Sequence, residues 1–131
     1  MPSMFVLLNH HLTPSQEQEA KDRLQIDRIE YPPTEIQNIW NNIPPEREDI
    51  APLISPICQW LETHSCSNDY IIVQGDCGAT FMVVEWALRN GRIPLYSTTA
   101  RRYESSTDES GNVINVHTFR HVIFRKYKRL S

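Results

Sequence analysis

The segment from Asp69 to Asn90 constrains the fold of this 131-residue chain more than any other. Asp69–Gln74 is rich in β-branched and aromatic residues, which predicts a strand, and apolar residues dominate 79–90, which predicts a helix. Between them lie Gly75 and Gly78, two of only 4 glycines in the chain. Because glycine is so rare elsewhere, we expect this turn to need unusual backbone geometry. The pattern predicts a buried strand that turns directly into a helix.

The rest of the chain repeats this alternation of strand and helix. Met4–Leu8 is a continuous apolar run, and Thr13–Gln16 carries an N-cap, a proline and a capping-box glutamine for a helix over 14–24. The other expected elements are a strand at 27–31, a helix over 34–42, a helix that starts near Ser55–Pro56 and ends near His64, a strand at 93–96, and a C-terminal hairpin around Asp108–Asn112. The alternation predicts one α/β domain over residues 1–131, with a Rossmann-like, mainly parallel sheet flanked by helices and a C-terminal β-hairpin.

Composition excludes several classes of protein. The longest apolar run, Met4–Leu8, is far shorter than the roughly 20 residues that cross a bilayer. The N-terminus also lacks the pattern of a secretory signal, so we expect a cytoplasmic protein without membrane contact. Cys58, Cys66 and Cys77 have no C-x-x-C spacing, and neither an H-E-x-x-H motif nor a carboxylate cluster occurs. We therefore expect no disulfide framework, no metal site and no cofactor.

Charge is divided unevenly along the chain. Residues 1–96 hold 6 Lys and Arg against 13 Asp and Glu, a balance of −7, whereas residues 97–131 hold 7 against 3, a balance of +4. An acidic protein with one basic region attracts a small anion to that region, while long DNA or RNA is repelled by the remainder. The alternative is that the basic residues only solvate a surface strand pair.

Three polar clusters follow strands of the predicted sheet: Asn9–His10, Gly75–Thr80 and Ser97–Arg101. Ligands of such sheets bind beyond the carboxyl ends of the strands, so we expect the clusters to meet at one crevice. The glycine turn would place free N–H groups and the positive end of a helix dipole there, which suits a phosphate. It matches neither the G-x-x-x-x-G-K-[ST] nor the G-x-G-x-x-G motif. The alternative is a tight turn without a ligand.

The available reactive groups favour a reaction in which the substrate brings its own nucleophile. They are imidazoles, hydroxyls, a carboxylate and a guanidinium, and they include His10, Asp76, Thr80, Thr98, Thr99, Arg101 and His121. Cleavage of RNA by its adjacent 2′-hydroxyl is such a reaction, because the protein only aligns the attack, stabilises charge on the phosphorane and moves protons. The alternative for His10 is a strand-end residue without a catalytic role.

Five segments resemble the small CRISPR-associated family Csx-twenty. They follow one another through essentially the whole chain: Phe5–Thr13, Ile39–Pro45, Val73–Thr80, Ile93–Thr99 and Phe119–Tyr127. The family looks like a stand-alone relative of the CRISPR-associated Rossmann-fold (CARF) domains. The resemblance implies a homodimeric ring nuclease of type III CRISPR systems, which degrades cyclic oligoadenylate, most often cyclic tetra-adenylate, without a metal. The product would be linear di-adenylate with a 2′,3′-cyclic phosphate, and the antiviral response would be switched off.

The resemblance also implies roles for individual residues. Catalysis would fall to His10, Asp76 and Thr99, with His10 assisting proton transfer. Contacts to the ring would come from Gln74, Gly75, Cys77, Gly78, Ala79, Thr80, Thr98 and Arg101, with the glycine turn and Arg101 holding phosphates. Asn9, from the first polar cluster, and His121, from the reactive groups, are further expected contacts. Two alternatives stay open. One is a module that senses or sequesters the cyclic nucleotide without cutting it, and the other is a protein-interaction domain that uses the apolar helix 79–90.

Overall fold

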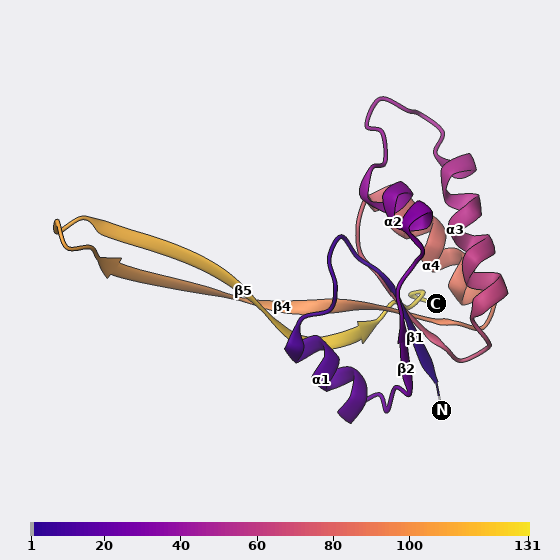
Figure 1. Ribbon diagram of the computed structural model, residues 1–131, viewed down its shortest axis with the longest axis horizontal. Helices are drawn as coiled ribbons and strands as arrows, with labels where there is room; N and C mark the ends of the chain where they lie inside the picture. The colour runs from indigo at the N-terminus through magenta and orange to yellow at the C-terminus, as the bar shows by residue number, and fades with distance from the viewer. Residues whose placement is uncertain (1) are drawn as a thin grey trace.

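A computed structural model describes residues 2–131, and it describes the side chains of all of these except 102–104 and 115–119. The chain forms a mixed α/β fold with helices on both faces of a mainly parallel sheet (Figure 1). Its elements, in chain order, are β1 (Ser3–Leu7), α1 (Pro14–Asp22), β2 (Arg28–Glu30), α2 (Thr34–Asn41), α3 (Ala51–His64), β3 (Tyr70–Val73), α4 (Cys77–Arg89), β4 (Ile93–Thr107) and β5 (Val113–Lys126). The predicted fold class is confirmed.

The five strands lie in the order β2-β1-β3-β4-β5. The first four are parallel, and β5 runs antiparallel to β4. From β1 the chain first moves outward to β2 and then crosses back to β3 on the other side of β1, so a topological switch point lies between β1 and β3. Leu7 lies beside Val73, and Ile72 lies beside Leu95. The residues that follow β1 and β3 therefore lie at the carboxyl end of the sheet, beside the part of β4 that follows Leu95.

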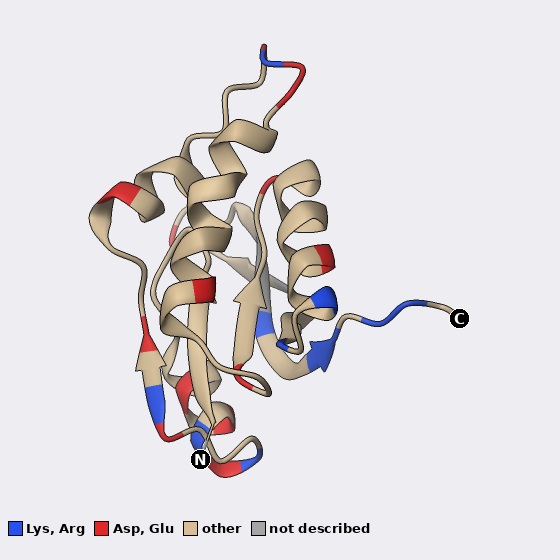
Figure 2. Cartoon of the chain, turned by 90° about the vertical axis from the view of Figure 1, so that its right-hand side faces the viewer, with Lys and Arg blue, Asp and Glu red and all other residues tan. Residues whose placement is uncertain are grey.

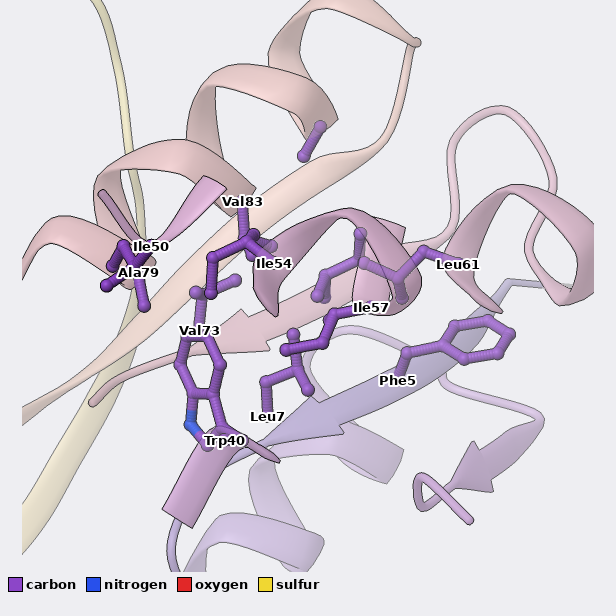
Figure 3. Close-up of a cluster of buried hydrophobic side chains, with 12 residues drawn as sticks. Phe5, Leu7, Trp40, Ile50, Ile54, Ile57, Leu61, Val73, Ala79 and Val83 are labelled. Carbon is purple, nitrogen blue, oxygen red and sulfur yellow. The ribbon is translucent and has the colours of Figure 1, made fainter. Parts of the chain in front are cut away.

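Both faces of the sheet are buried, which explains the continuous apolar run of β1. Phe5 and Leu7 belong to a cluster with side chains of α2, α3 and α4, and Figure 3 shows Trp40 and Ile57 in this cluster. Met4 and Val6 point to the opposite face, where the cluster includes Ala20 of α1. The helices thus form one layer of three and one layer of one around the sheet.

Of two helix starts predicted from local sequence, one is confirmed and one is wrong. α1 begins as predicted, because the Thr13 hydroxyl accepts the Gln16 N–H at 3.3 Å and the Gln16 side chain accepts the Thr13 N–H at 2.9 Å. The predicted start of α3 at Ser55–Pro56 is wrong. This helix begins at Ala51, whose N–H is accepted by the Asp49 carboxylate at 3.0 Å, and Pro56 lies inside it.

β4 and β5 form a single long hairpin that projects away from the body of the molecule as an arm (Figure 1). The predicted strand at 93–96 is only the first part of β4, which continues to Thr107. The predicted turn is confirmed: the Asp108 N–H donates to the Asn112 carbonyl at 2.8 Å, and Gly111 has a φ of +85°. The arm leaves the sheet at Ser97–Thr99, where the pairing with β5 shifts in register.

The distribution of charge follows the division seen in the sequence. Acidic segments are spread over the helices and loops of the body, and basic segments mark the end of β5 and the C-terminal tail but also occur on β2 and in the loop before α3 (Figure 2). Within residues 2–131, no helix has both the length and the apolar character that a membrane span requires.

Candidate functional site

A hollow of about 290 Å³ lies at the carboxyl ends of the strands, at the switch point of the sheet. Its lining comes from the segments after β1 and β3, from β4 and from α1: Leu8, Asn9, His10, Gln16, Gln74, Gly75, Ser97 and Thr99. The expected meeting of three polar strand ends is therefore confirmed. Asn9, His10 and Thr99 are exposed in this hollow. The His10 ring is oriented by its Nδ1, which lies 2.6 Å from the carbonyl oxygen of His11.

A second hollow of about 360 Å³ shares Gln74 and Gly75 with the first and extends over the start of α4. It is also lined by Cys77, Thr80 and Tyr127. Thr80 Oγ1 is buried and has no hydrogen-bond partner among the described residues, although buried hydroxyls normally have one. This hollow is therefore lined by a residue whose buried hydroxyl has unused hydrogen-bonding capacity.

Gly75 is required by a close approach rather than by unusual backbone geometry. A Cβ at this position would lie 2.9 Å from three atoms of the Trp40 indole, a distance that real Cβ contacts do not show. The same indole donates its N–H to the Gln74 carbonyl at 3.2 Å. Among the described glycines, a positive φ occurs at Gly91 and Gly111 and not at Gly75 or Gly78. The expectation of unusual backbone geometry at the glycine turn is therefore wrong. Position 75 needs a glycine because the Trp40 ring packs directly against it.

The first turn of α4 is partly occupied by the chain itself. Asp76 is the N-cap, and its carboxylate accepts the Ala79 N–H at 3.0 Å. The Ala79 methyl group is fully buried in the core, so the N–H and the methyl group of Ala79 both serve to hold the fold. Cys77 and Gly78 are exposed at the same helix start. Two of the expected ligand contacts thus face solvent, whereas Ala79 does not.

Thr98 and Arg101 lie outside the lining of both hollows. The Thr98 hydroxyl donates to the Ile123 carbonyl and accepts the Ile123 N–H, both at 3.1 Å. It therefore bridges the two strands at the register shift where the arm begins. Arg101 is exposed further along β4, on the arm itself.

Ser97, His121 and Glu19 form a continuous chain of hydrogen bonds that ends at the first hollow. Ser97 Oγ bonds to His121 Nδ1, and His121 Nε2 lies 2.5 Å from Glu19 Oε1. The His121 side chain is only 5% exposed, so a ligand in the hollow would reach this ring through Ser97. His121, expected as a direct ligand contact, is instead the middle member of this chain.

Glu19 is held as a carboxylate by several donors. Burial raises the pKa of Glu19, but hydrogen bonds from the Phe124 N–H, the Arg23 guanidinium and His121 outweigh burial and leave the pKa below its usual value. Arg23 also donates to the Phe124 carbonyl at 2.7 Å. Glu19 of α1 and Arg23, which caps this helix, thus bond the outer backbone edge of β5 at Phe124, which covers part of an edge strand.

Three basic residues of the C-terminal third, together with Arg23, line a different hollow, of about 590 Å³, at the outer edge of the sheet. Its basic lining comprises Arg23, Arg125, Lys126 and Lys128. The Arg125 guanidinium lies 5.5 Å from the centre of the Tyr96 ring and donates to its hydroxyl at 2.9 Å. These cations therefore lie beside the strand-end hollows rather than inside them.

The opposite, amino end of the sheet carries a hollow of about 550 Å³. Its Asp69 carboxylate accepts the N–H groups of Ser3 at 3.0 Å and Cys66 at 2.8 Å, so it is engaged in joining chain segments. In the part of the chain that the structure describes, no three His, Cys, Asp or Glu side chains converge as metal ligands. Arg28, His64 and Cys66 also line this hollow.

Residues 2–125 match the family described as "Uncharacterized protein MJ1673 family". The chain belongs to the MJ1673 family. It is 42% identical over 127 residues to "Uncharacterized protein MJ1673" of Methanocaldococcus jannaschii, and the alignment covers 97% of this chain and 98% of that relative. No solved structure matches the chain.

For this member of the MJ1673 family, the sequence predicted where the polar strand ends meet but did not indicate Ser97 and Glu19 as members of a hydrogen-bonded chain. Ser97 carried a signal, since it opens the polar cluster after the predicted strand at 93–96. Glu19 carried none, because it is joined to His121 across 102 positions of sequence and only the packing of α1 against β5 brings them together.

Proposed function

We propose that this protein is a ring nuclease that cleaves cyclic oligoadenylate, with cyclic tetra-adenylate as the expected substrate. The 2′-hydroxyl of an adenosine would attack the adjacent phosphorus, a bond from oxygen 2′ to phosphorus would form, and the bond to the 5′-oxygen would break. The products are linear di-adenylates with a 2′,3′-cyclic phosphate. Acting in the cytoplasm, such an enzyme would switch off type III CRISPR antiviral signalling.

The observation that carries the proposal is the hollow at the switch point. It brings an imidazole, His10, together with the hydroxyls of Ser97 and Thr99 and the amides of Asn9 and Gln74. These groups suit a reaction that needs alignment, proton transfer and hydrogen bonds to a developing charge. The sequence resemblance to the Csx-twenty family supports the same substrate.

Roles follow from the position of each group. The N–H groups of the exposed residues Cys77 and Gly78, at the start of α4, would contact phosphate oxygens, while Asp76 holds that turn in place through its cap. Thr99 and Asn9 would position the ring. His10 would give a proton to the leaving 5′-oxygen.

The size of the hollow favours a homodimer. A volume of about 290 Å³ lies just below the range of about 300–1,000 Å³ that drug-sized ligands occupy, so it has room for only part of a four-nucleotide ring. Two hollows related by a two-fold axis would offer the same contacts to each half of a symmetric ring. The arm exposes Val113 and Ile114 near its tip, and Val122 and Ile123 are exposed at its base, which offers apolar surface for a second subunit.

The test is to mix the purified protein with cyclic tetra-adenylate in EDTA and to separate the products by chromatography. We expect linear di-adenylate with a 2′,3′-cyclic phosphate, and a ring that survives would refute the proposal for this substrate. His10→Ala should slow cleavage more than it weakens binding, whereas His64→Ala, an exposed histidine at the amino end of the sheet, should change neither. Equal losses of rate and affinity would make His10 a binding residue only.

The second candidate function is a module that senses or sequesters the ring without cutting it, and the same lining residues would serve that use. Tight binding of a ring that remains intact would favour it. A protein-interaction domain that uses the surface of α4, where Phe81 is 70% exposed, predicts neither binding nor cleavage.

A further inference from the structure

We propose that Ser97, His121 and Glu19 form the relay that removes the proton from the attacking 2′-hydroxyl. Hydroxyl, imidazole and carboxylate follow one another in the order of the catalytic triads that activate a hydroxyl. The assignment rests on the proposed ring-nuclease function, and it adds a base to a site in which only the proton donor had been assigned. Neither Ser97 nor Glu19 was expected from the sequence to take part.

The partners of Glu19 decide the direction of the hydrogen bonds. The carboxylate accepts the Phe124 N–H at 2.9 Å and the Arg23 Nε–H at 2.6 Å, and these donors keep it ionised, as its lowered pKa indicates. An ionised carboxylate only accepts, so His121 Nε2 must carry the proton that points to Glu19. In the neutral ring Nδ1 is then an acceptor, and the Ser97 hydroxyl donates its proton to it rather than to the Thr98 carbonyl, which lies 3.4 Å away.

This arrangement allows a balanced proton transfer. Ser97 lines the hollow, and its Oγ would take the proton of the 2′-hydroxyl while its own proton passes to His121 Nδ1. The freed 2′-oxygen bonds to phosphorus, and the 5′-oxygen leaves with a proton from His10. The imidazolium that forms on His121 is stabilised by the Glu19 carboxylate, and loss of this proton to water resets the relay.

Packing and backbone hydrogen bonds hold His121 and Ser97 in the positions that the relay needs. The His121 ring is 5% exposed and packs against the Phe124 ring, with 4.6 Å between the ring centres. Ser97 is held in the strand by its own N–H, which donates to the Gln74 side chain at 2.8 Å. Ser97 is thus the member of the relay that a substrate in the hollow would touch, and Glu19 is a positioning residue that acts through His121.

A structural role predicts a different outcome from a relay. Glu19 and Arg23 also bond the backbone of β5 at Phe124. In a purely structural role, Ser97, His121 and Glu19 would only fasten α1 to the base of the arm. In that case, substitutions would lower the melting temperature and leave the cleavage rate of the folded protein unchanged. A relay predicts that Ser97→Ala lowers the cleavage rate and leaves the melting temperature nearly unchanged, because the hydroxyl is small and the backbone hydrogen bonds of Ser97 survive the substitution.

The experiment is single-turnover cleavage of cyclic tetra-adenylate in EDTA, with affinity for the ring and melting temperature measured on the same samples. Ser97→Ala is expected to lower the rate by about 10²–10⁴-fold, the usual range for loss of a general base, with affinity within twofold of wild type. His121→Asn, which keeps an acceptor near Nδ1 but no basic group, should lose rate to a similar extent. The matched controls are Ser67→Ala, an exposed serine at the amino end of the sheet, and Glu17→Gln on α1, and both should cleave at the wild-type rate.

Coupling between variants separates the relay from independent contributions. Because relay members act as a unit, Ser97→Ala combined with Glu19→Gln should be no slower than Ser97→Ala alone, within about threefold. A folded Ser97→Ala variant that cleaves within tenfold of wild type would overturn the relay and leave the nuclease standing. So would a phosphate group covalently trapped on Ser97, since that product belongs to a serine nucleophile. A wild-type protein that leaves the ring intact would overturn the proposed function, and the relay with it.

Discussion

Substitution of Gly75 by alanine should destabilise the protein, because the added methyl group would lie 2.9 Å from the Trp40 ring. The ring is buried and its N–H bonds to the Gln74 carbonyl, so it has little freedom to move away. Overpacking of a filled core costs about 1–3 kcal/mol, and loss of the indole hydrogen bond adds about 0.5–1.5 kcal/mol. We therefore expect the free energy of unfolding to fall by about 1.5–4.5 kcal/mol.

The fall can be converted into a change of melting temperature. An unfolding entropy of about 2.1 cal/mol/K per residue gives roughly 0.28 kcal/mol/K for 131 residues, so the melting temperature should drop by about 5–16 °C. Thermal and urea unfolding followed by tryptophan fluorescence measure this directly.

Gly78→Ala is the matched control, because a Cβ there would meet its nearest atoms at 3.5 and 3.6 Å, which is ordinary contact. Alanine also favours a helix, so this variant should unfold at the same temperature as wild type or slightly higher. In a Trp40→Leu background, Gly75→Ala should cost almost nothing. A Gly75→Ala variant as stable as wild type, or an equal cost with and without Trp40, would refute the argument that this close approach dictates the glycine.

Three further predictions concern charge, thiols and assembly. The pKa of Glu19 is lowered in the folded state, so the ionised carboxylate stabilises the fold at a pH above its usual pKa of about 4.5, and this stabilisation is lost as the pH falls through the folded-state pKa. The difference in free energy of unfolding between wild type and Glu19→Gln should therefore shrink on acidification. A difference that grows would contradict this prediction. Burial raises the pKa of Cys58 to about 11, while Cys66 and Cys77 are exposed, so a thiol reagent at pH 8 should label two cysteines fast and Cys58 slowly, and rapid reaction of all three would show this packing to be wrong. Gel filtration with cyclic tetra-adenylate should give a dimer, and a monomer with and without the ring would count against a shared site.

Local patterns predicted the elements whose signals lie within a few residues. The capping box of α1 and the turn at Asp108–Asn112 form as expected, since their hydrogen bonds join near neighbours. The strand predicted at Asp69–Gln74 forms over Tyr70–Val73, because its β-branched and aromatic residues favour an extended backbone. The meeting of the polar strand ends followed from the parallel alternation alone, because such sheets place their ligand sites at one edge.

Features that depend on distant contacts were missed or misjudged. The start of α3 was misplaced because a proline inside a helix normally costs about 3 kcal/mol, yet Ile50, Ile54, Ile57 and Leu61 bury one face of this segment and outweigh that cost. Gly75 was assigned the wrong reason, since nothing near it in sequence indicated that Trp40 would pack on it. The pairing of Glu19 with His121 likewise exists only after α1 docks on β5.

Cleavage of cyclic tetra-adenylate by the wild-type protein and by Ser97→Ala, side by side in EDTA, tests the central claim most directly. The account predicts linear di-adenylate with a 2′,3′-cyclic phosphate from the wild type, and a rate lower by about 10²–10⁴-fold from a Ser97→Ala protein that folds and binds the ring normally. A wild-type protein that binds the ring and returns it uncut would contradict it.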